Sequence, residues 1–369
     1  MKQATIKDVA EAARCSTTLV SRVMNAPRKP DGTPDCVVNP KTAERIFEAV
    51  KTLGYRPNKA AVSLRKKLRK RIGVILPDLS NQFFAGIAKQ FEMIARQNGY
   101  TVLFGSSNDN NDLLYQTAQT FIEDGVDGII LTPGADCEDQ VRSLTNYGFP
   151  LVLIIRDIPQ IDNIGKILLD SADATTSILD HLIQNGFRHI DMLSKELRLS
   201  IVKEREDLYV EYMKSHGMEH KIHHASESDS DIEIILEQAR RQGTDAIYCI
   251  SAALPVRCIA SSKANGIRIP DDIALCGYDG GRLYDALSPT ITQIEYSHEE
   301  IAHEAFRMLM QMASQQECIP EKRYLKGKLV IGESTTKPKT GNETGKQESA
   351  KDEILAAIDS LRKALNELK

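Results

Sequence analysis

A short segment near the N-terminus carries hydroxyl groups and a guanidinium at helical spacing. Thr17, Thr18, Ser21 and Arg22 follow Ser16, which can cap a helix that begins at the next residue. Hydroxyls can hydrogen-bond to base edges or phosphates, and a guanidinium can bind guanine through two hydrogen bonds. Such side chains at the start of one helix indicate contacts with the major groove of double-stranded DNA.

Two short helices joined by a turn are expected to hold these side chains. Thr5 can cap a first helix, in which Asp8 occupies the third position and favours the helix N-terminus. Apolar residues at positions 6, 9, 10 and 13 lie on one face, and the helix stops near position 14. The second helix runs from Thr17 to about Asn25. The pattern predicts a helix-turn-helix, although a helical hairpin with only a packing role has the same spacing.

A third helix is expected after Asn39 and Pro40, a cap and a first-turn residue. Its apolar face comprises Ile46, Ala49, Val50 and Leu53, and the glycine at position 54 ends it.

The charge is distributed unevenly along the 369 residues, although the formal net charge is only −4. Residues 1–71 hold 17 Lys and Arg against 6 Asp and Glu, a charge of +11, and the remainder holds 30 against 45, a charge of −15. A small basic end on an acidic body points to an anionic partner for that end alone. The densest basic run, 65–71, is also compatible with a solvated linker.

Three strings in this region resemble the LacI/GalR (lactose-repressor) family of transcriptional regulators. They are residues 5–10 (TIKDVA), 16–25 (STTLVSRVMN) and 53–58 (LGYRPN). The resemblance implies that the second helix binds the major groove, and that a hinge helix from Asn58 enters the minor groove, where Leu64 acts as an apolar wedge. The alternative for Leu64 is a leucine that only packs a helix. The DNA-binding residues implied are Thr5, Ser16, Thr17, Thr18, Ser21, Arg22, Asn25, Tyr55, Asn58, Ala61 and Leu64.

Two features depart from the family pattern. Arg14 occupies a turn position that is usually glycine, and the loop over residues 26–36 is longer than usual. The loop is rich in proline and glycine, as expected of a surface loop. Either Arg28 and Lys29 add contacts to the DNA backbone, or the extra length is only tolerated.

Strands and helices alternate from position 72 onward, which predicts two lobes with parallel sheets. The pattern resembles the periplasmic-binding-protein-like core of the same family, with matching strings at 77–84, 124–128, 186–190, 269–273 and 277–279. The domains expected are an all-α helix-turn-helix headpiece at 1–57, a hinge helix and basic linker at 58–71, a two-lobed effector-binding and dimerisation core at 72–336, a flexible linker at 337–350 and an oligomerisation helix at 351–369.

Ligands of open α/β sheets lie beyond the carboxyl ends of the strands, here in the cleft between the lobes. Arg205 matches the family's effector-binding arginine, although a surface arginine at a helix start is the alternative. Ser251 and Ala252 stand where the family usually has Asn-Asp, and Leu208 replaces a usual Gly, so a simple free monosaccharide is not favoured. The candidate effector residues are Asp78, Gln82, Phe83, Arg156, Arg205 and Asp279, with Asp157 beside Arg156 and the region of Asp170 and Asp173 as further candidates.

The C-terminal segment has apolar residues spaced by four and three, with charged residues between them. This is the seam of a coiled coil, and about 17 residues are marginal as a lone helix. We therefore expect the segment to join homodimers into a dimer of dimers, with a helix folded back on its own body as the alternative. The seam residues are Ile354, Ile358, Leu361, Leu365 and Leu368.

The sequence excludes several other classes. No run approaches the roughly 18 apolar residues of a membrane span, and no apolar signal segment follows Met1. Seven scattered cysteines without a C-x-x-C pair fit a reducing cytoplasm, and no motif of an enzyme, metal site or cofactor site is present.

The resemblance implies a cytoplasmic, non-enzymatic regulator, most often a repressor, that binds a palindromic DNA operator as a homodimer and responds to a small-molecule, carbohydrate-derived effector. The alternative is a global regulator that is constitutive or controlled by a protein cofactor, with a degenerate pocket.

Overall fold

The structure is a computed structural model, and it describes residues 5–26, 38–53, 69–145, 149–195, 199–226, 229–314 and 321–336. The chain forms two units, Met1–Arg69 and Lys70–Lys369, and each is described by itself. The predicted loop at 26–36 lies almost wholly outside the described residues. The expectations for Tyr55, Asn58, Ala61 and Leu64, for the linker at 337–350 and for the five seam residues of the C-terminal segment also lie outside them.

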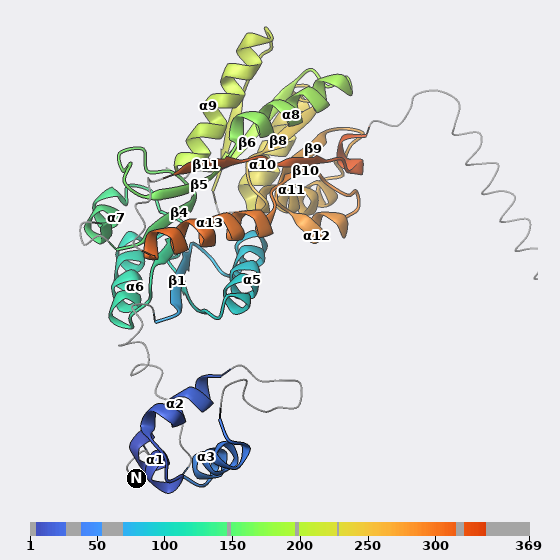
Figure 1. Cartoon of the computed structure of the whole chain (residues 1–369). Coiled ribbons are helices and arrows are strands. Elements are labelled where there is room, and N and C mark those ends of the chain that lie inside the picture. The colour runs from blue at the N-terminus through green and yellow to red at the C-terminus, as the bar shows by residue number, and fades with distance from the viewer. Residues whose placement is uncertain are drawn as a thin grey trace, which may run out of the picture. The chain divides into compact units, whose positions relative to one another are not determined.

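The described residues of the first unit form three helices: α1 (Ile6–Ala12), α2 (Thr17–Asn25) and α3 (Pro40–Leu53) (Figure 1). The predicted caps are confirmed. Thr5 and Asp8 form a capping box, in which the Thr5 amide donates to the Asp8 carboxylate at 2.7 Å. The Ser16 hydroxyl accepts the amide of Leu19 at 3.2 Å and so caps α2.

A small aliphatic core holds the three helices together. Its buried members are Val9, Ala10, Ala13, Val20, Val23, Ala43, Ile46 and Ala49. The spacing of apolar residues predicts that Leu53 lies on the buried face of α3, but this residue is 39% exposed. The last turn of α3 therefore contributes less to this core than its spacing suggested.

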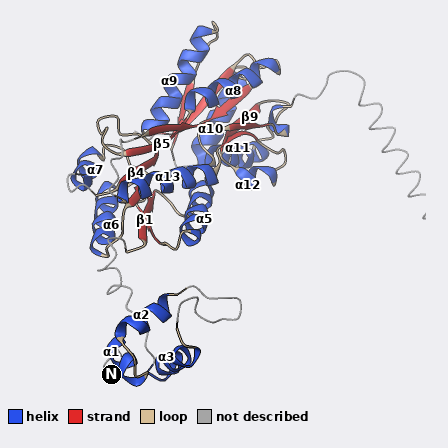
Figure 2. Ribbon diagram, viewed as in Figure 1, coloured by secondary structure: helices blue, strands red, loops and turns tan. Residues whose placement is uncertain are grey.

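The second unit contains two sheets with helices on both sides of the strands (Figure 2). The first sheet is parallel throughout, in the order β11-β5-β4-β3-β1-β2. Its strands are β1 (Arg71–Leu76), β2 (Thr101–Ser106), β3 (Ile129–Leu131), β4 (Leu151–Ile155), β5 (Gly165–Leu169) and β11 (Lys322–Leu325). Its helices are α5 (Gln82–Gln97), α6 (Asn111–Glu123), α7 (Glu138–Thr145) and α13 (His298–Ala313).

The second sheet has the order β12-β10-β9-β8-β6-β7, and only β12 runs antiparallel, against β10. Its strands are β6 (Ile190–Lys195), β7 (Ile222–Ala225), β8 (Ala246–Cys249), β9 (Ala274–Tyr278), β10 (Thr292–Glu295) and β12 (Lys328–Val330). Its helices are α8 (Ser171–Gln184), α9 (Ser200–Ser215), α10 (Asp229–Arg241), α11 (Ala253–Ala264), α12 (Gly281–Asp285) and the 3₁₀ turn η1 (Glu333–Thr335).

The chain passes between the lobes three times: after β5, after β10 and after β11. Helix α13 follows β10 but packs against α5, β4 and β5 of the first lobe, and β11 then joins that sheet beside β5. Each lobe is therefore completed by residues from distant parts of the chain. No helix among the described residues is long and apolar enough to cross a bilayer.

The last described segment is held tightly against the second lobe at Gly332. A Cβ atom there would lie 2.6 Å from both the carbonyl carbon of Ile291 and the carbonyl oxygen of Thr290. We expect Gly332→Ala to lower the free energy of unfolding by about 1–3 kcal/mol, because backbone atoms cannot move aside as a flexible side chain could.

Urea denaturation of the full chain would measure this loss. The neighbouring Ile331, which is 62% exposed, provides the control: Ile331→Ala should change stability by less than about 0.5 kcal/mol. Equal stability of both variants would show that the backbone shifts freely around Gly332.

Candidate nucleic-acid interface and interlobe cavity

Helix α2 presents one polar face and one buried face. Val20 and Val23 are fully buried in the three-helix core, while Thr17, Thr18 and Arg22 are exposed. The core thus fixes the rotation of α2 about its axis and leaves its predicted DNA-contacting side chains at the surface. The structure brings these three side chains together, with Ser21 half-buried on the same helix.

Two of the predicted contact residues also stabilise helix ends. The Thr5 hydroxyl donates to the Asp8 carboxylate at 2.8 Å, and the Ser16 hydroxyl accepts from Leu19, yet both residues remain exposed. Asn25 is the last residue of α2. Its side chain is not among those that the structure describes.

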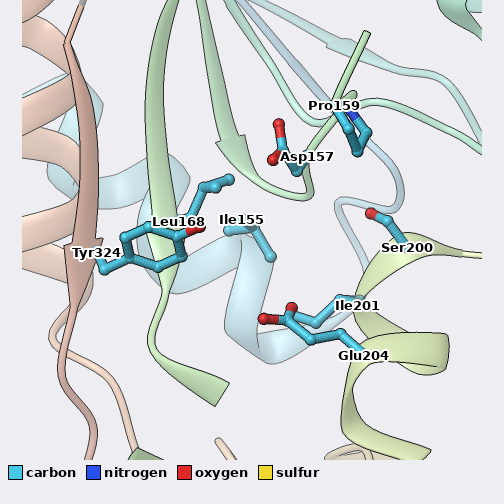
Figure 3. A pocket seen from close by; sticks show the side chains of 8 residues that line it. All are labelled: Ile155, Asp157, Pro159, Leu168, Ser200, Ile201, Glu204 and Tyr324. Atoms are coloured by element: carbon cyan, nitrogen blue, oxygen red, sulfur yellow. The ribbon is translucent and has the colours of Figure 1, made fainter. Parts of the chain in front are cut away.

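A cavity of about 180 Å³ lies between the two lobes of the second unit (Figure 3). The first lobe contributes the last residue of β4, residues that follow this strand, and residues on β5 and β11, and the second lobe contributes the first turns of α9. The lining residues are Ile155, Asp157, Pro159, Leu168, Ser200, Ile201, Glu204 and Tyr324.

Asp157 ties the first-lobe wall of the cavity together. Its carboxylate forms an ion pair with Lys166 Nζ at 2.7 Å and accepts a hydrogen bond from Lys322 Nζ at 2.8 Å. Burial acts to raise the pKa of Asp157, but the two lysines outweigh burial and hold the pKa below its ordinary value. The carboxylate therefore stays ionised at neutral pH. Lys166 is itself buried on β5 and also donates to the carbonyl of Ile158 at 2.8 Å.

Glu204 provides the second carboxyl group, from the opposite lobe. Loss of surrounding water raises its pKa, while a hydrogen bond from Ser171 Oγ at 3.3 Å and the charge of Arg205 act in the other direction. Helix α9 begins at Ser200 without a side-chain cap from Leu199. The cavity therefore offers carboxylate acceptors, the Ser200 hydroxyl and the apolar side chains of Ile155 and Leu168.

The six predicted effector residues lie outside the lining of this cavity, and four of them belong to the first lobe. The Asp78 carboxylate accepts from the amide and hydroxyl of Ser80, both at 2.7 Å, which lowers the pKa of Asp78. Gln82 is exposed at the start of α5. Phe83 is buried edge-to-face against His298 at 5.3 Å between ring centroids. Arg156 is buried, pairs with the carboxylate of Asp109 and donates to the carbonyl of Pro133 at 3.0 Å.

Arg205 and Asp279 come close together in the second lobe. The guanidinium carbon of Arg205 lies 3.7 Å from the ring centroid of Tyr278, and Nη1 donates to the carbonyl of Ile250 at 2.6 Å. Its Nε is buried without a hydrogen-bond partner among the described residues. Asp279 accepts the amide of Tyr296 at 2.9 Å. Burial raises the pKa of Asp279 to about 7, although this hydrogen bond and the charge of Arg205 oppose the rise.

Tyrosines that were not predicted from the sequence as site residues enclose this Arg205 site. The hydroxyls of Tyr248 and Tyr278 hydrogen-bond to each other, and Thr175 lies 3.2 Å from the Tyr248 hydroxyl. The substituted position Ser251 has a buried hydroxyl without a partner among the described residues, and the carbonyl of Ala252 accepts from Tyr284 at 2.9 Å.

Sequence reasoning named Asp157 but missed Ser200, Glu204 and Tyr324. Glu204 directly precedes Arg205, and Ser200 and Ile201 begin the same helix, so the start of α9 was an available signal. Tyr324 carried no signal, because β11 was not predicted as a strand. The described residues contain no group of three or more histidine, cysteine or acidic side chains that could bind a metal.

Two family models match the chain. Residues 5–58 match the model of bacterial regulatory proteins of the lacI family, and residues 179–335 match the model of a periplasmic binding protein-like domain. Together the two matches cover more than half of the chain.

Relatives match along nearly the whole length. Catabolite control protein A of Priestia megaterium is 29% identical over 313 residues, which are 83% of this chain and 91% of that protein. The HTH-type transcriptional repressor PurR of Mannheimia succiniciproducens is 26% identical over 340 residues, 90% of this chain and 99% of that protein.

Solved structures share the fold. The crystal structure of the lac repressor dimer bound to operator and the anti-inducer ONPF superposes with a TM-score of 0.77 at 22% identity, and covers 91% of this chain and 100% of that chain. The chain therefore carries, in this order, a DNA-binding domain of the lacI family of bacterial regulatory proteins and a periplasmic binding protein-like domain.

Proposed function

We propose that this chain is a sequence-specific DNA-binding transcriptional regulator that represses transcription as a homodimer on a palindromic operator. The observation that carries the proposal is the exposure of Thr17, Thr18 and Arg22 on a capped helix whose opposite face is buried. A helix-turn-helix presents its second helix to the major groove in this way. The charge of +11 over residues 1–71 supplies affinity for phosphates regardless of sequence.

The two-lobed unit is proposed to bind a small-molecule effector that modulates operator affinity. A ligand in the cavity would contact Asp157 and Tyr324 of the first lobe and Ser200 and Glu204 of the second. Such a ligand favours the lobe arrangement in which it makes all these contacts, and by linkage it shifts the affinity for DNA. Hydroxyl groups of a carbohydrate-derived molecule would donate to the carboxylates and accept from Ser200.

One observation favours the second candidate function, a global regulator that is constitutive or controlled by a protein cofactor. Arg205, the family's effector-binding arginine, stacks on Tyr278 and donates to the carbonyl of Ile250, and Ala252 removes an acceptor from the same region. The absence of any saturable small-molecule ligand would support this candidate.

Base recognition by α2 can be tested at Arg22. Arg22→Ala should lower affinity for an operator selected from random duplexes by about 1–3 kcal/mol and relax the preference at one base position. Fluorescence anisotropy on the operator and on a scrambled duplex would measure both effects. A loss of the same size on the two duplexes would show that Arg22 contacts phosphate and not a base.

The proposed effector can be sought by a direct binding screen. A thermal-shift screen of monosaccharides, sugar phosphates and nucleobases should yield a stabilising ligand, whose affinity calorimetry would then measure. Glu204→Gln should weaken that affinity, and Glu123→Gln, an exposed carboxyl on α6, should leave it unchanged.

The pH dependence of that affinity separates the two regions of the second unit. Asp279 has a pKa of about 7, so its ionised form, the better acceptor, increases as pH rises from 6 to 8. Affinity for a hydroxyl donor bound at Asp279 would rise over this range. Asp157 is already ionised there, so its contribution in the cavity would stay constant. If affinity rises with pH and Asp279→Asn abolishes that rise, the ligand binds at Asp279 and not in the proposed cavity.

The C-terminal segment is proposed to join two dimers through its apolar seam, which rests on the sequence pattern alone. Removal of residues 351–369 should convert a tetramer to a dimer in multi-angle light scattering, with DNA binding to a single operator retained. An unchanged mass would favour a helix folded back on its own body.

A further inference from the structure

Arg14, in the turn between α1 and α2, has an unusual backbone conformation. Its φ is +51°, in the left-handed region that favours glycine. Two hydrogen bonds hold the turn in place: Cys15 donates to the carbonyl of Ala10 at 2.9 Å, and Arg14 donates to the carbonyl of Glu11 at 3.1 Å. These are the paired bonds of a Schellman motif, in which the left-handed residue is usually glycine. Glycine is therefore the conformationally preferred residue at this position, and arginine is strained.

Contacts within the described part of the chain do not offset that strain. The Arg14 side chain is exposed, and no salt bridge or cation–π contact joins its guanidinium to any described residue. Asp8, the acid at the start of α1, is engaged by Thr5 in the capping box. A strained residue that persists without an internal partner suggests a function outside the chain.

The position of Arg14 indicates what that function is. Arg14 precedes Ser16, the cap of α2, by two residues, and two residues span at most about 7 Å. Thr17 and Thr18 follow the cap and are exposed. When this end of α2 enters the major groove, Arg14 comes to the edge of the groove, where the phosphates lie. A guanidinium binds phosphate through charge-assisted hydrogen bonds.

We propose that Arg14 binds a backbone phosphate beside the groove that α2 enters. This inference rests on the proposed DNA-binding function and adds to it a contact that a glycine, the residue favoured by this turn, cannot make. The contact is independent of base sequence, because phosphates are the same at every step. It fixes the depth and orientation of α2 from its N-terminal side.

The experiment compares Arg14→Gly, Arg14→Gln and Arg14→Lys in the full chain. Each variant is melted thermally and titrated with the selected operator and a scrambled duplex at several salt concentrations between 50 and 200 mM. Arg14→Gly relieves the strained turn, so its melting temperature should equal or exceed that of the wild type. Its affinity should nevertheless fall several-fold, by the same factor on both duplexes.

The salt dependence is the decisive measurement. Each phosphate contact contributes about −0.9 to the slope of log affinity against log salt, so Arg14→Gly and Arg14→Gln should both flatten the slope by about that amount. Arg14→Lys should keep it. Lys51→Gln, which removes the same charge from the last turn of α3, is the matched control and should leave the slope nearly unchanged.

Three outcomes would overturn the inference: unchanged slopes in Arg14→Gly and Arg14→Gln, an equal change in Lys51→Gln, or a loss confined to the operator, which would indicate a base contact. Failure of the proposed function itself looks different, because the wild-type chain would then show no salt-dependent binding to any duplex.

Discussion

The carboxylate of Asp157 is the constraint on which the two-lobed unit depends. It is held by Lys166 on β5 and by Lys322 on β11, two neighbouring strands that adjoin connections between the lobes. Removing the carboxylate would leave the buried ammonium group of Lys166 without its counter-charge, which costs several kcal/mol, whereas the pair with the half-exposed Lys322 contributes less. The same carboxylate faces the interlobe cavity. A ligand that hydrogen-bonds to it therefore acts directly on the strands through which the lobes are connected.

Local signals made the headpiece predictable from sequence. The caps at Thr5 and Ser16 and the glycine-like turn at Arg14 each depend on residues within one helical turn of one another. The spacing of Val20 and Val23 was also sufficient to orient α2, because a helix can bury only one face against a small core. The misplacement of Leu53 arose where α3 ends, since the periodicity of a helix does not reveal how far its neighbours extend.

The strands β5, β7, β10, β11 and β12 were not predicted from the sequence. The buried strand β5 contains Lys166, which is stable there only because Asp157 and the carbonyl of Ile158 satisfy it, and that partnership is visible only in three dimensions. Strand β11 pairs with β5 across more than 150 residues of sequence. The lining of the cavity could not be predicted for the same reason, because Tyr324 lies on β11 and Glu204 lies on α9 of the other lobe. Arg205 and Asp279 were named from the family resemblance and a strand end, and their role as effector residues stays a prediction, whereas the tyrosines that enclose Arg205 were not named.

The distribution of charge determines how a ligand could influence DNA binding. The contacts with phosphates and bases are assigned to the basic N-terminal region, whereas the rest of the chain carries a charge of −15 and is repelled by DNA. A ligand in the interlobe cavity therefore cannot strengthen binding by adding DNA contacts of its own lobes. In the homodimer proposed above, its influence would pass through the arrangement of the two headpieces, because the proposed palindromic operator rewards only the spacing and orientation that place both α2 helices in successive grooves. Under this constraint, phosphate contacts such as that proposed for Arg14 set the affinity of each single headpiece for DNA. The arrangement of the lobes then determines whether both headpieces of the proposed dimer can bind the operator at the same time.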